Sequence, residues 1–226
     1  MTRDPEPLRH GLLVEYVSLT WMTVECIAAI YSGMAAWSLA LLAFGGDSLV
    51  ELLSSFAVVQ HLRTSLTSKG SSTDHVETKR FEWATVLLLT SLIPVIGFAS
   101  VYSFLIGIEP ESSLLGIAVA IAAVVIMPIL WFEKKQIGKA THCLTLTIDS
   151  VESATCFWMS VVLLSGLLIN YVWKVPWIDY AATFVLLVFV AREALESIDE
   201  VRKSHPVRIV IADDTPNQRR DGLFRS

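Results

Sequence analysis

The sequence predicts an all-α integral membrane protein with six transmembrane helices and with both termini in the cytoplasm. Of its 226 residues, 54% are hydrophobic and 17% are charged, and the mean hydropathy is +0.58. This composition is too apolar for a soluble domain of this size. Six apolar stretches are long enough to cross a bilayer, and nearly all basic residues fall on one side of them.

A spanning helix needs about 20 mostly apolar residues. The first stretch that qualifies follows a polar leader, residues 1–13, that contains proline. It has no small-residue cleavage site, so we interpret it as a retained helix and not as a signal peptide. Short connections join the stretches into hairpins on one side of the membrane. The six stretches are residues 14–31, 37–61, 83–106, 114–132, 143–170 and 178–195.

The longest connection, residues 63–80, is polar, and we expect a solvated, mobile loop there. The chain becomes charged again near its end, where about 25 residues are too few to form a stable domain. We therefore divide the chain into the leader, a transmembrane domain (14–200) and a cytoplasmic tail (201–226). The three cysteines are too scattered for a disulfide framework, and no phosphate-binding loop or nucleic-acid module is present.

The orientation follows from the basic residues. All of them except Lys174 lie in the leader, in the connections 63–80 and 133–142, or from Arg192, just inside the end of the sixth stretch, to the end of the chain. Lys134, Lys135 and Lys139, for example, fall between the predicted fourth and fifth helices. Because basic residues concentrate on the cytoplasmic side of a membrane, both termini are expected in the cytoplasm.

Several acidic residues lie inside the predicted spans: Glu25 in the first, Asp47 and Glu51 in the second, and Asp149 and Glu152 in the fifth. A carboxylate at the centre of a spanning helix costs at least about 2.5 kcal/mol on insertion scales. Such residues are therefore rare, and they usually face a partner, a polar cavity or a substrate. Hydrogen bonding between helices is the alternative explanation, and it is strongest for Glu25 and Glu152.

The spacing of these acids places them on shared helix faces. Asp47 and Glu51 are one turn apart. On the first helix, Glu25 lies seven residues after Ser18 and seven before Ser32, so these three also share a face. A third polar stripe runs along the fifth helix and consists of His142, Thr145, Asp149, Ser153, Cys156 and Ser160. Three such stripes facing inward would form a hydrophilic path through the membrane.

Asp47, Glu51 and Asp149 could supply a mostly oxygen coordination shell for a divalent cation, with Ser153, Glu152 or Cys156 close by. Without the ion, at least one of the acids would bind a proton, because neighbouring negative charges repel each other in a low dielectric. Metal and protons would then compete for the same oxygens. Packing is the commoner role of a lone buried cysteine. His142, at the end of its helix, fits either a ligand at the cytoplasmic entrance or a simple interfacial histidine.

The second stretch, WSLALLAFGGDSLVELLSSFAVVQHLR, resembles the cation diffusion facilitator (cation efflux) family, in its short bacterial form without a cytoplasmic C-terminal domain. The fifth, LTIDSVESATCFWMSVVLLSGLLIN, and the start of the sixth, WIDYAATF, are similar to the same family. The resemblance implies two pairs of metal ligands. Asp47 and Glu51 match the first pair, and Asp149 matches the first position of the second pair. Ser153 stands where the family usually has aspartate.

The resemblance further implies a homodimer in the bacterial inner membrane that exports a divalent metal (Zn, Mn, Fe or Co) in exchange for protons. An oxygen-rich site without histidine suits manganese or iron at least as well as zinc. The expected partners are metal ions, protons and the lipid bilayer, with no cofactor, no nucleic acid and no enzymatic activity. A metal-binding sensor or scaffold that moves no ions is an alternative. An intramembrane aspartyl protease using Asp47 and Asp149 fits less well, because the motifs around both aspartates differ from those such enzymes need.

Overall fold

The computed structural model describes residues 5–67, 72–141 and 144–203, and these residues form six long helices with short connections. The predicted all-α fold is confirmed. The helices are α1 (Pro5–Ala36), α2 (Leu39–Thr67), α3 (Ser72–Ile106), α4 (Leu114–Thr141), α5 (Leu144–Trp173) and α6 (Trp177–Lys203).

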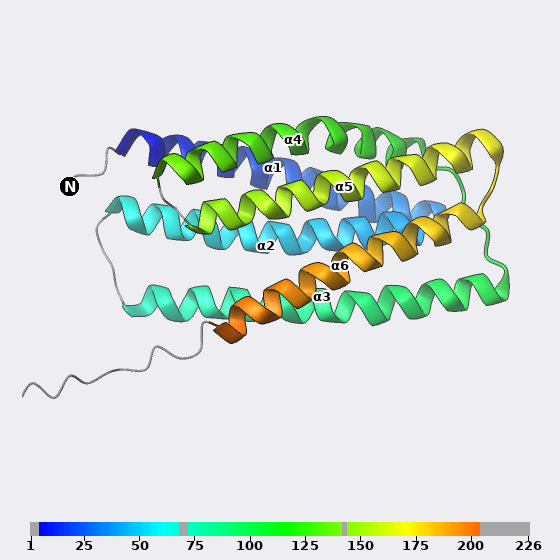
Figure 1. Cartoon of the computed structure of the whole chain (residues 1–226). Coiled ribbons are helices and arrows are strands. Elements are labelled where there is room, and N and C mark those ends of the chain that lie inside the picture. The colour runs from blue at the N-terminus through cyan, green and yellow to red at the C-terminus, as the bar shows by residue number, and fades with distance from the viewer. Residues whose placement is uncertain (1–4, 68–71, 142–143, 204–226) are drawn as a thin grey trace, which may run out of the picture.

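The helices run roughly side by side in an elongated bundle (Figure 1). Helices α1, α2, α4 and α5 pack against one another, while α3 and α6 form a second pair that contacts α2, and α6 also contacts α5. The start of α1 and the end of α6 lie toward the same end of the bundle, and the connections α1–α2, α3–α4 and α5–α6 lie at the other (Figure 1). The structure therefore places both ends of the described chain on one side, as an even number of membrane crossings requires.

Each of these three connections begins with a residue in the left-handed conformation. Trp37 and Lys174 have φ of 54° and Gly107 has φ of 75°. Directly after a helix this conformation redirects the chain and lets amide groups bond the last helical carbonyls. The amide of Ser38, for example, donates to the carbonyl of Gly33 at 3.0 Å. The sharp hairpins predicted from the short connections are therefore present.

The start of α2 is capped by a residue from the other end of the chain. Asp179 lies in the first turn of α6, where an acidic residue commonly caps its own helix. Its carboxylate instead accepts hydrogen bonds from the hydroxyl of Ser38 (2.5 Å) and the amide of Leu39 (3.0 Å). Buried acceptors of this kind satisfy the free amides at a helix start. Asp179 thus ties the start of α2 to the start of α6.

Five helices, α1 to α5, are long and apolar enough to cross a membrane within the described residues. Helix α6 falls outside this group, and its sequence carries Asp179, Arg192 and Glu193 within the predicted span. It nevertheless exposes large apolar side chains, among them Phe184 (70% exposed) and Val188 (55%). A surface of this kind is stable against lipid and unfavourable in water. The chain is therefore a multi-pass membrane protein.

The helices extend beyond the predicted spans at the end of the bundle where the chain begins. Helix α2 continues to Thr67 and α3 begins at Ser72, so the prediction of a mobile loop over 63–80 is wrong for most of that segment. The helix propensity of polar residues such as Glu and Lys is about as high as that of leucine. Hydropathy marks the part of a helix inside the membrane, not the point where the helix ends. His142 and most of the predicted tail lie outside the described residues.

Candidate metal centre

Two consecutive glycines let neighbouring helices approach α2 just before its acidic residues. A Cβ atom on Gly45 would lie 2.8 Å from Cγ1 of Ile30 on α1, and one on Gly46 would lie 2.7 Å from Cδ1 of Leu92 on α3. Both distances are too short for a real side chain. Small residues at such positions allow close packing of membrane helices. The glycine pair thus holds Asp47, the next residue, deep between helices.

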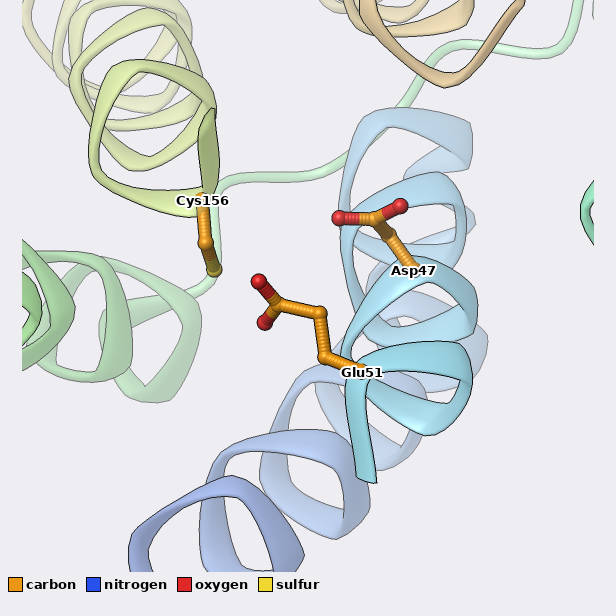
Figure 2. Close-up of side chains that lie close together, drawn as sticks. All are labelled: Asp47, Glu51 and Cys156. Carbon is orange, nitrogen blue, oxygen red and sulfur yellow. The ribbon is translucent and has the colours of Figure 1, made fainter. Parts of the chain in front are cut away.

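Asp47, Glu51 and Cys156 form a buried cluster between α2 and α5. One possible ligand atom from each residue lies within 4.8 Å of the others. Figure 2 shows Glu51 extending from α2 toward the Cys156 side chain on α5, with the carboxylate of Asp47 one turn away along α2. All three residues are 2% exposed or less. Two carboxylates and one thiol therefore converge in the interior of the bundle.

The carboxylates of this cluster lack partners that would compensate for their burial. Both oxygens of Asp47 and Oε2 of Glu51 have no hydrogen-bond partner among the described residues. Within the same residues, no lysine or arginine forms an ion pair with either acid. A buried carboxylate in this state costs several kcal/mol of stability unless a cation or a proton neutralises it. The arrangement could hold a cation.

Glu25 of α1 lies beside the cluster and contacts its thiol. Its Oε1 accepts hydrogen bonds from the Ser48 hydroxyl at 2.8 Å and from the Cys156 thiol at 3.6 Å. Oε2 of Glu25 has no partner in the described part of the chain. The seven-residue repeat in α1 is buried as expected, with Ser18, Glu25 and Ser32 all 1% exposed or less. The first helix therefore contributes an acid that touches a possible ligand.

Two further acids lie close to the cluster. Glu152 is one turn before Cys156 on α5, is partly buried, and accepts a hydrogen bond from the Ser54 hydroxyl at 3.1 Å. Glu193 of α6 interacts electrostatically with both Asp47 and Glu152. Sequence reasoning missed Glu193 because it stands at the charged end of the last apolar stretch. An acidic residue inside a predicted span, here 178–195, was the signal that could have identified Glu193.

Asp149 and Ser153, expected from the sequence as the ligands on the fifth helix, make other contacts in the structure. The Asp149 carboxylate accepts hydrogen bonds from the Lys134 ammonium and from the Ser55 hydroxyl, the latter at 3.1 Å. The Ser153 hydroxyl donates to the main-chain oxygen of Asp149 at 3.3 Å. Cys156 follows Asp149 by seven residues, or about 10 Å along a helix. The two residues share a face, but Cys156, and not Asp149, groups with Asp47 and Glu51.

Lys134 corrects a second expectation. The sequence places it in a connection on the cytoplasmic side, whereas it is a fully buried residue of α4. Besides the hydrogen bond to Asp149, its ammonium lies 3.4 Å from Oε2 of Glu15 on α1. Neither Lys134 nor Glu15 was identified as a site residue from the sequence. A lysine followed by a second lysine after an apolar run looks like a membrane boundary.

The comparison with known proteins agrees with this architecture. A search of curated proteins found no match. The sequence model of the cation efflux transmembrane domain matches residues 15–204. This range covers most of the chain and includes Asp47, Glu51 and Cys156 with parts of all six helices. It confirms the resemblance noted in the second and fifth stretches, and the chain therefore belongs to the cation efflux family of metal cation transporters.

Proposed function

We propose that this protein exports a divalent metal cation from the cytoplasm and that the ion binds between Asp47, Glu51 and Cys156 on its way. The observation that carries this proposal is the convergence of two buried carboxylates and a thiol, with no lysine or arginine paired to either acid in the described part of the chain. The double charge of the ion would neutralise the two carboxylates. The ligands would in turn replace its hydration shell.

The donor set favours zinc within the range expected for the family. Thiolate ligands select zinc over manganese, which prefers oxygen donors. The oxygen-rich site expected from the sequence suits manganese or iron at least as well as zinc. The inclusion of Cys156 shifts the preference toward zinc. Glu152 is one turn from Cys156 and could complete a four-ligand shell by a change of side-chain rotamer. Asp149 and Ser153 then line the path without holding the ion.

Proton exchange has a specific acceptor in this proposal. Zinc binds the thiolate, so the Cys156 thiol must lose its proton when the ion arrives. The Cys156 thiol already donates a hydrogen bond to Oε1 of Glu25. Glu25 can therefore take this proton as zinc binds. If Glu25 releases the proton to one side of the membrane, and the thiolate takes a new proton from the other side when zinc leaves, metal movement is coupled to proton movement.

The buried polar stripes of α1, α2 and α5 supply the path for alternating access. Ser18 and Ser32 of α1 lie on either side of Glu25, and Ser153 and Ser160 of α5 lie on either side of Cys156. All four side chains are 1% exposed or less. In this mechanism the helices rock against each other and open the stripes first to the cytoplasm and then outward. The orientation of the chain, with both termini in the cytoplasm, is the one that the positive-inside rule gives.

Zinc flux into proteoliposomes under an imposed pH gradient tests the proposal. Purified protein should carry zinc, and Asp47→Ala and Glu51→Ala should each abolish the flux while the protein stays folded. Cys26→Ala is a matched control for Cys156→Ala, because Cys26 is a buried thiol outside the cluster. Unchanged flux in both acid variants would contradict the proposed site. Zinc binding without any flux in the wild type would favour a sensor or scaffold.

A further inference from the structure

A single buried lysine joins three helices at a second point of the bundle. Lys134 of α4 contacts Asp149 of α5 and Glu15 of α1, and all three side chains are 2% exposed or less. The Ser55 hydroxyl of α2 completes the group by donating to Asp149 at 3.1 Å. We call these four residues the lysine cluster. It gathers one residue from each helix of the α1, α2, α4 and α5 group.

The lysine cluster lies on the polar path next to the proposed metal centre. Ser55 is one turn beyond Glu51 on α2, toward the end of the bundle where the chain begins. Asp149 is two turns from Cys156 in the same direction. An ion moving between that end and the metal centre along the stripes of α2 and α5 would pass the cluster. The ammonium group of Lys134 lies against Asp149 on the α5 stripe.

The two carboxylates of the cluster carry the countercharge of a divalent ion when both are ionised. Two buried carboxylates face one ammonium group, which leaves one negative charge in excess if both acids are ionised. Oε1 and Oε2 of Glu15 have no hydrogen-bond partner among the described residues, although Oε2 lies 3.4 Å from the ammonium nitrogen of Lys134. Two carboxylates and a hydroxyl are also the oxygen donors that hard divalent cations bind.

We propose that the ammonium group of Lys134 occupies a second cation position, built from Glu15, Asp149 and Ser55, as a cation tethered to the protein. The tether keeps a second metal ion out, so that only the Asp47, Glu51 and Cys156 centre is loaded. The consequence for ion stoichiometry rests on the proposed transport site, whereas the second position itself is independent of it. Lys134 is thus a specificity residue, and its removal should expose an oxygen-lined metal site.

Manganese binding to the full-length protein in detergent tests this inference. Manganese is chosen because the position offers only oxygen donors. The background is Asp47→Asn with Glu51→Gln, which silences the proposed transport site. In this background, Lys134→Ala should bind one Mn²⁺ per chain, detected by the electron paramagnetic resonance spectrum of the bound ion. Adding Asp149→Asn should weaken this binding by at least the ~10-fold that loss of a supporting partner costs.

Lys135→Ala is the matched control, because Lys135 is the next residue on α4 and lies over the Trp131 ring, outside the cluster. It should bind no additional Mn²⁺. Should Lys134→Ala fail to fold, Lys134→Gln keeps the length of the side chain and adds an amide oxygen, and the same binding is expected. A folded Lys134→Ala or Lys134→Gln variant without Mn²⁺ binding would overturn the inference. Because the background lacks both acids of α2, this result is independent of whether zinc flux requires Asp47.

Discussion

Replacing Asp47 by leucine should stabilise the metal-free protein while removing transport. Asp47 is 1% exposed, and neither of its oxygens has a hydrogen-bond partner among the described residues. An unpaired buried polar group costs about 1–3 kcal/mol, and a charged one costs more. Leucine has nearly the same shape as aspartate and needs no partner. The metal-free variant should therefore gain about 1–3 kcal/mol in its free energy of unfolding.

Thermal unfolding in detergent, with a chelator or with zinc, measures this effect. For a chain of this length, 1 kcal/mol shifts the unfolding midpoint by about 2–4 °C. In the chelator the midpoint of Asp47→Leu should exceed that of the wild type by about 2–12 °C. Zinc at a hundredfold excess over its dissociation constant should stabilise the wild type by about 2.7 kcal/mol and leave the variant unchanged.

A lower midpoint for Asp47→Leu in the chelator would refute this reasoning. It would mean that Asp47 stabilises the packing of α2, and that its burial does not reflect a reserved cation site. The comparison separates function from structure because the two roles predict opposite signs. A residue retained for ligand binding commonly reduces the stability of the protein that carries it.

Three further changes test separate parts of the account. Gly45→Ala should cost about 1–3 kcal/mol of unfolding free energy by forcing α1 away from α2, whereas Gly97→Ala, whose Cβ would meet only a contact at 3.7 Å, should not destabilise. Cys156→Ser should weaken zinc binding at least ~10-fold by calorimetry, while Cys26→Ser should bind normally. Ser38→Ala removes a hydrogen bond at the start of α2 and should cost about 0.5–2 kcal/mol in thermal unfolding, with normal zinc flux per folded protein.

The number of helices and their type were predictable because a bilayer fixes the length of an apolar stretch that crosses it. The ends of the helices were not. Residues 72–80 are polar yet helical, since helix propensity and membrane depth are separate properties. Helix α6 was recognised from its apolar residues, although Asp179 and Arg192 reduce the signal. Asp179 bonds to α2, a pairing of distant residues that local patterns do not encode.

The candidate site was predictable on α2 and less so on α5. The four-residue spacing of Asp47 and Glu51 puts both on one face of any helix, so their association follows from helix geometry. The stripe on α5 gives the direction in which Asp149 and Cys156 point, but not which of them is level with α2. That depends on how the two helices slide and tilt against each other, which periodicity does not determine.

Lys134 was misplaced for a related reason. Counting basic residues assumes that each of them reaches water at the membrane surface. Lys134 is instead buried and contacts two acids, Glu15 and Asp149, on neighbouring helices. The sequence contains all three residues, but their proximity appears only when α1, α4 and α5 are packed together. Buried ion pairs between helices are therefore the least predictable part of this fold.

X-ray absorption at the zinc edge tests the central claim most directly, because it reports the atoms bound to the ion. Zinc bound to the purified wild type should show one sulfur ligand at about 2.3 Å together with oxygen ligands at about 2.0–2.2 Å. The sulfur contribution should disappear in Cys156→Ser and remain in Cys26→Ser. A wild-type spectrum without sulfur, or one dominated by imidazole, would contradict the centre formed by Asp47, Glu51 and Cys156.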